Sequence, residues 1–99
     1  MEIKKEQNGT SLTMFLSGRL DTVAAADFEK ELEASLNDVS ALVLDCAELT
    51  YVASSGLRAF LMAQKRMNKQ GSMKVRHVQD AVMEVLAMTG FDDLLQIEK

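Results

Sequence analysis

The sequence has one cysteine, one histidine and neither proline nor tryptophan among its 99 residues. Cys46 alone cannot form an intramolecular disulfide, and together with His77 it supplies too few ligands for a Cys/His zinc site. Long apolar runs are also missing: no stretch approaches the roughly 20 residues that cross a bilayer, and residues 1–10 are too polar for a signal peptide. We therefore expect a cytoplasmic protein that holds no metal and does not insert into a membrane.

Size and charge narrow the class of protein further. A chain of 99 residues, 47% hydrophobic and 26% charged, suits one domain over residues 1–99. Such a domain hides about 60–70% of the surface of the unfolded chain, which builds one core and leaves little room for a large active-site cleft. Eleven basic and fifteen acidic residues give a net charge of −4, the wrong sign for neutralising the phosphates of a nucleic acid. We expect neither enzymatic activity, nor a cofactor, nor nucleic-acid binding.

The spacing of apolar residues predicts alternating strands and helices. Asn8-Gly9 favours a tight hairpin between the first two strands, because both residues tolerate positive φ. After Thr22 apolar residues recur every three or four positions, as in an amphipathic helix. The run Ala41–Leu44 has no polar alternation, which is typical of a strand covered on both faces. The predicted strands cover residues 1–7, 10–17, 41–44, 72–77 and 94–98, and the predicted helices cover 22–36, 54–68 and 79–89.

This order of elements predicts the fold class. The pattern β-β-α-β-α-β-α-β places single helices between consecutive strands, which implies right-handed crossovers and a mostly parallel sheet. We expect an α/β domain with a mixed sheet of four to five strands and three or more helices. Residues 45–53 are predicted as a loop that joins a central strand to the second helix.

Ser54 stands where this loop meets the second predicted helix. The unpaired N–H groups and the positive dipole end of a helix start favour anionic oxygens, and ligands bind at this edge of open α/β sheets. Serine is also among the best N-cap residues, so capping by Ser54 or Ser55 explains these serines without any ligand. From these residues alone, capping is the favoured interpretation.

Four motifs along nearly the whole chain resemble a STAS domain of the bacterial anti-sigma factor antagonist type. They are Ser17-Gly18-Arg19-Leu20-Asp21, Leu42-Val43-Leu44-Asp45, the stretch Leu49–Leu57 with the sequence LTYVASSGL, and Met88-Thr89-Gly90-Phe91. The resemblance implies a partner-switching protein whose dephosphorylated form binds an anti-sigma factor that is also a serine kinase, and so releases a sigma factor. Phosphorylation of one serine by that kinase ends the binding, and a serine phosphatase restores it.

The resemblance also implies roles for single residues. With Gly56 as the anchor, Ser54 is the phosphoacceptor, Ser55 is its neighbour, and Asp21 matches an acidic residue of the family. The chain departs from the family at Ala53, where many members carry an acidic residue, so it lacks a carboxylate that would help to position the serine. Asp21 is also expected to be the N-cap of the helix that begins at Thr22.

The second predicted helix carries a basic stripe on an acidic protein. Its members fall on the arc opposite the apolar positions, and they are Arg58, Met62, Lys65, Arg66 and Lys69. One interpretation is a docking face for the partner beside Ser54, with Met62 as an apolar centre among cations. The other interpretation is an ordinary solvated helix face with one exposed methionine.

Two other functions fit parts of the sequence. The first is a STAS subunit that is never phosphorylated and binds a membrane transport or other regulatory complex constitutively. The second is a small hydrolase using Ser54 or Ser55, for which only His77 or a carboxylate could serve as the base. Cys46 is expected to be a small buried hydrophobe. The free protein is expected to be a monomer.

Overall fold

The hairpin predicted at Asn8-Gly9 opens the sheet. In the computed structural model, which describes residues 1–98, β1 (Glu2–Asn8) runs antiparallel to β2 (Ser11–Leu20), and Gly9 has a φ of 64° in the turn between them. The positive φ is the backbone conformation that such a short turn requires.

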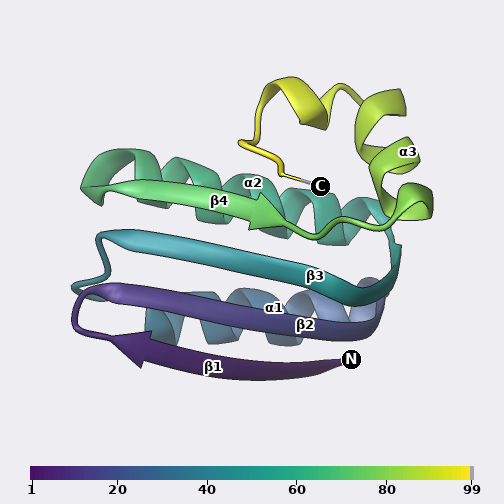
Figure 1. Cartoon of the computed structure of the whole chain (residues 1–99). Helices are drawn as coiled ribbons and strands as arrows, with labels where there is room; N and C mark the ends of the chain where they lie inside the picture. Colours follow the sequence, from purple (N-terminus) through teal and green to yellow (C-terminus); the bar gives the residue numbers. More distant parts are fainter. Residues whose placement is uncertain (99) are drawn as a thin grey trace.

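The rest of the chain adds parallel strands through helical crossovers. β3 (Ala41–Val52) pairs parallel with β2, and β4 (Ser72–Arg76) pairs parallel with β3, so the sheet has the order β1-β2-β3-β4. α1 (Thr22–Ser35) and α2 (Ser54–Gln70) connect these strands, and both lie on the same face of the sheet (Figure 1). α3 (Asp80–Met88) and the short 3-10 helix η1 (Phe91–Asp93) follow β4. The predicted α/β class and mixed sheet are confirmed.

The core fills the space between the sheet and the two crossover helices. Phe28 of α1 and Phe60 of α2 meet edge to face at its centre, with ring centroids 5.9 Å apart. The start of α2 packs so closely on the sheet that a Cβ at Gly56 would lie 2.7 Å from Cγ of Leu20 and 3.0 Å from Cγ1 of Val52. Glycine at position 56 therefore sets how near α2 begins to the ends of β2 and β3.

The loop predicted over residues 45–53 is wrong, because β3 continues to Val52. The second strand was predicted to end at residue 17, but β2 continues to Leu20. The two strands stay paired through register shifts on either side of Gly18. Leu49 and Val52 are buried in this stretch, while their polar neighbours Glu48 and Thr50 are exposed. Irregular pairing of this kind breaks the strict alternation by which a strand is recognised in a sequence.

The strand predicted over residues 94–98 is also wrong except at one position. The segment forms a single parallel bridge, Ile97 with Val75, in which the Val75 N–H donates to the Gln96 carbonyl and the Glu98 N–H donates to the Val75 carbonyl. The preceding residues form η1 instead, after Gly90 with a φ of 77°. No helix among residues 1–98 is long and apolar enough to cross a membrane.

Candidate functional site

Ser54 is the first residue of α2, and its side chain is exposed. The N-cap is Ala53, which has extended backbone angles (φ −84°, ψ 169°) and no side-chain oxygen to accept a hydrogen bond. The interpretation of Ser54 or Ser55 as the N-cap is therefore wrong. Within residues 1–98 the Ser54 hydroxyl has no hydrogen-bond partner, so it faces solvent at the positive end of a 17-residue helix.

Ser55 has a different environment from its neighbour. Its side chain is half-buried, and its hydroxyl donates to Oγ1 of Thr22 at 3.4 Å. This contact links the first turn of α2 to the first residue of α1. Of the two adjacent serines, only Ser54 therefore presents a hydroxyl that a partner can reach without breaking a contact within the protein.

Asp21 lies at the same edge of the sheet as Ser54. Its carboxylate accepts from the Ala24 N–H at 2.9 Å, which confirms the predicted N-cap of α1. Leu20 pairs with Val52 across the parallel strands, and the Ala53 N–H donates to the Leu20 carbonyl at 2.9 Å. The chain thus leaves two adjacent strands at matched positions, and two helix starts stand side by side there.

The solvent face of α2 carries three of the predicted partner-binding residues. Arg58, Lys65 and Lys69 are exposed, and within residues 1–98 none of them forms an ion pair. Their spacing from Ser54 of 4, 11 and 15 residues places all four side chains on one side of the helix. We call Arg58, Lys65 and Lys69 the basic face. Gly56, Phe60, Ala63 and Met67 are buried on the opposite side, as predicted.

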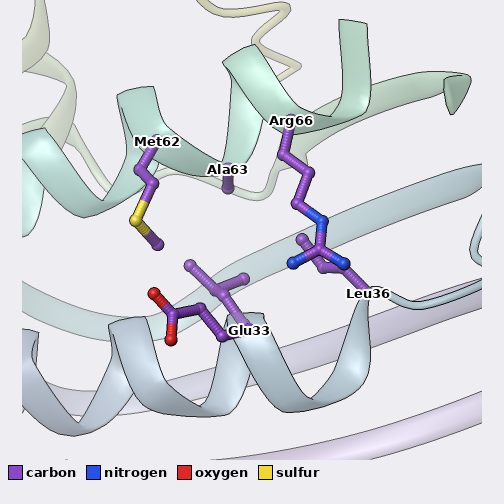
Figure 2. A pocket seen from close by; sticks show the side chains of 6 residues that line it. Glu33, Leu36, Met62, Ala63 and Arg66 are labelled. Carbon is purple, nitrogen blue, oxygen red and sulfur yellow. The ribbon is translucent and has the colours of Figure 1, made fainter. Parts of the chain in front are cut away.

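Met62 and Arg66 turn toward α1 instead of completing this basic face. Met62 is half-buried and packs against the core, and Arg66 donates from Nη2 to Oδ1 of Asn37 at 2.9 Å. Figure 2 shows both side chains reaching from α2 toward α1. The expected apolar centre among cations is therefore corrected: Met62 lies at the margin of the basic face and lines a groove between the helices.

Asp45 is a buried carboxylate at the end of the sheet, and its contacts were not predicted from the sequence. Asp45 accepts from Nε of Arg76 at 2.9 Å and from the Ala47 N–H at 3.0 Å, and its Oδ2 lies 3.0 Å from Nδ1 of His77. Burial raises the pKa of Asp45, but these hydrogen bonds outweigh burial and hold the pKa below its usual range. Two features of the sequence pointed to this place: Asp45 closes one of the four motifs, and Asp45 and Arg76 both stand near the carboxyl ends of predicted parallel strands.

This cluster weighs against the hydrolase alternative. Within residues 1–98, neither His77 nor any carboxylate makes a hydrogen bond to the hydroxyl of Ser54 or Ser55. Within residues 1–98 neither serine hydroxyl therefore has a hydrogen-bonded base, which an activated nucleophile needs.

Cys46 is buried as predicted, and burial together with the charge of Asp45 raises the pKa of its thiol to about 12. Among residues 1–98 no three His, Cys, Asp or Glu side chains gather where they could hold a metal ion.

Comparison with known protein families shows which family this chain belongs to. The family model described as "Mlab, STAS domain" matches residues 3–96, nearly the whole chain. The chain belongs to the STAS-domain family. The anti-sigma-B factor antagonist of Listeria monocytogenes is similar to this STAS domain, with 25% identity over 96 residues that cover 95% of the chain and 84% of the relative.

Solved structures share the fold of this STAS domain. An anti-sigma factor antagonist from Mycobacterium paratuberculosis has a TM-score of 0.88 at 22% identity, over 98% of this chain and 84% of its own. SpoIIAA in its unphosphorylated form has a TM-score of 0.84 at 16% identity, over 99% and 89% of the two chains. Bacillus SpoIIAA in the phosphorylated form has a TM-score of 0.76 at 15% identity, over 99% and 92%. The architecture is therefore that of antagonists solved both with and without phosphate.

Proposed function

We propose that this STAS domain is a phosphorylation-controlled protein-binding module. In its dephosphorylated form it binds an anti-sigma factor that is also a serine kinase, and this binding frees the sigma factor. Phosphorylation of Ser54 by that kinase ends the binding, and a serine phosphatase reverses it. The observation that carries the proposal is the exposed Ser54 hydroxyl, which begins α2 without a partner among residues 1–98. The names of the relatives, anti-sigma factor antagonists, supply the class of partner.

A phosphate at Ser54 is compatible with the fold. It adds nearly two negative charges and three acceptor oxygens at neutral pH. At the start of α2 these oxygens meet the positive end of the helix dipole and N–H groups that no capping side chain satisfies. The phosphorylated domain should therefore keep its structure, so the effect of the modification falls on the interface.

The same charge explains why binding ends. Asp21 begins the neighbouring helix at the same edge, so the phosphate adds to negative charge already present there. Like charges brought together in an interface cost several kcal/mol, which corresponds to about a hundredfold or more in affinity. The domain needs no catalytic base for this switch, because the kinase supplies nucleotide, metal and base.

The basic face gives the partner an electrostatic approach to Ser54. Arg58, Lys65 and Lys69 are the exposed cations of α2 on a protein whose net charge is −4. Unpaired surface charges of this kind raise the association rate of an oppositely charged partner and lose that effect as salt is added. The proposal therefore includes an acidic surface on the anti-sigma factor, lying along α2.

Intact mass measurement tests the proposal. Purified domain is incubated with Mg-ATP and each anti-sigma factor kinase encoded in the same genome. One phosphoryl group is expected on the wild type and on Ser55→Ala, the matched control, and none on Ser54→Ala. Ser54→Ala should bind the kinase like the dephosphorylated wild type, and Ser54→Asp should bind more weakly. Equal affinities of Ser54→Ala and Ser54→Asp would remove the charge mechanism.

Ala53 favours a second candidate function. Because this chain lacks the acidic residue that many members carry before the acceptor serine, constitutive binding to a membrane transport or other regulatory complex is the alternative role. Under that role no kinase in the set modifies Ser54, and Ser54→Asp leaves the affinity for the complex unchanged. The same mass and binding measurements therefore separate the two functions.

A further inference from the structure

A solvent-open groove with a partly apolar lining lies between α1 and α2. It has a volume of about 140 Å³. Its floor consists of Leu32, Leu36 and Ala63, which are fully buried. The side chains that an incoming group meets first are those of Met62, Glu33 and Arg66, which border the groove (Figure 2). A closed aliphatic cavity of about 150 Å³ holds a benzene ring, and this open groove of similar volume has room for the end of one apolar side chain.

The two sides of the groove carry opposite charges. Glu33 is exposed on α1, and Glu29 stands one turn earlier on the same side of that helix. Arg66 lies on α2, next to the basic face. Within residues 1–98 Glu33 forms no ion pair, and Arg66 is bonded to the uncharged side chain of Asn37. Each side therefore keeps its charge for an incoming segment.

We propose that this groove receives one apolar side chain of an amphipathic helix of the partner protein, with acidic residues of that helix over α2 and a basic residue over α1. The inference deepens the proposed function, because it rests on the domain being a protein-binding module and names the chemistry of the segment that it binds. Opposite charges on the two sides also set the direction of docking, since a helix with its acidic flank over α1 would meet Glu29 and Glu33.

The spacing of the cations on α2 suits a helix. Arg58 and Lys65 are seven residues apart, which is two turns or about 10 Å along the axis. Acidic residues seven apart on the docked helix meet both of them, and an apolar residue three or four positions from one acid reaches the groove beside Met62. Methionine adapts its shape to the side chain that enters, which suits the rim of a binding groove.

A peptide titration tests the groove by itself. The probe is an alanine-based helical peptide of about 18 residues, with leucine on one stripe, glutamate on one flank and lysine on the other. Backbone amide shifts of the full domain are expected at Leu32, Glu33, Met62 and Ala63. A serine-for-leucine peptide should give no saturable shifts, and a peptide with glutamate and lysine exchanged should bind at least about fivefold more weakly. Shifts elsewhere, self-association of the domain instead of peptide binding, or equal affinities of the peptides would overturn the inference.

Charge reversal in the domain checks the proposed orientation. Glu33→Lys is at an exposed position, and Glu84→Lys on α3 makes the same charge change away from the groove. The probe should bind Glu33→Lys about fivefold more weakly and Glu84→Lys like the wild type. In the double variant Glu33→Lys/Arg66→Glu, the charge-exchanged peptide should become the better ligand. If the two peptides keep their wild-type ranking there, the orientation is wrong.

The kinase that modifies Ser54 provides the last comparison. Glu33→Lys should weaken its binding, and Glu84→Lys should not. If Ser54 is phosphorylated and Glu33→Lys binds the kinase like the wild type, the groove inference falls while the proposed function stands. If the probe peptide binds the groove as described and no kinase modifies Ser54, the inference stands and the phosphorylation switch falls.

Discussion

Ala53→Asp should make the domain more stable. Ala53 already has the extended backbone of an N-cap, but α2 begins without a side-chain acceptor, although it is 17 residues long. An aspartate there would accept from the N–H of Ser55 or Gly56. Replacing alanine by a good N-cap residue is worth about 0.5–2 kcal/mol. For a domain of this length a gain of about 1 kcal/mol raises the melting temperature by about 4–8 °C.

Ala53→Asn is the matched variant for this experiment, because it supplies the same acceptor without charge. Both variants should unfold at higher urea concentration and temperature than the wild type at pH 7, measured by circular dichroism. Only Ala53→Asp gains from the helix dipole, which is worth about 0.3–1 kcal/mol. Its carboxyl is expected to have a lowered pKa in the folded state, so its added stability is present above about pH 4 and disappears as the pH falls below that. If neither variant is more stable than the wild type, the start of α2 does not lack an acceptor.

Other measurements follow from the core and the buried carboxylate. Because the pKa of Asp45 is lowered on folding, its contribution to the free energy of unfolding is present above about pH 4 and lost in acid. Asp45→Asn should lower the free energy of unfolding at pH 7 by about 2 kcal/mol, measured by urea unfolding, and should make that free energy depend less on pH in the acid range. Gly56→Ala should cost about 1–3 kcal/mol in the same assay, partly offset by about 1 kcal/mol of helix propensity, and an unchanged midpoint would contradict the close approach to Leu20. Cys46 should react with a thiol reagent at pH 7 only on unfolding, because its pKa is about 12.

The helices were predictable because each has one buried stripe. The apolar positions of α1 and α2 repeat at helical spacing, so their existence and buried faces followed from the sequence, as did Asp21 as an N-cap. The far half of β3 was not predictable in the same way. One face of that strand is open to solvent, and its pairing with β2 is irregular around Gly18, so local alternation is lost.

The position of Ser54 at the start of α2 was predictable from the sequence, but the local geometry there was not. Whether Ala53 or Ser54 is the N-cap depends on the backbone conformation of a single residue, and sequence patterns locate helix ends only to within one or two residues. Which members of the basic stripe are exposed depends on which side of α2 faces α1. Met62 and Arg66 lie at an angle about the helix axis that brings them toward α1, whereas Lys65 points to solvent. The contact between Asp45 and His77 joins residues 32 positions apart, which no local pattern reveals.

The single bridge at Val75 has a consequence for the edges of the sheet. Backbone groups along an outer strand can recruit another chain and start aggregation. At β4 the segment around Ile97 already occupies the N–H and carbonyl of Val75, and on the other outer strand Lys4, Lys5 and Glu6 place charges that discourage a new strand. Both outer strands of the sheet are thus protected against pairing with another chain, β4 by the segment around Ile97 and β1 by its charged side chains. The helix starts at the carboxyl end of β2 and β3 stay open to recognition while strand addition is resisted.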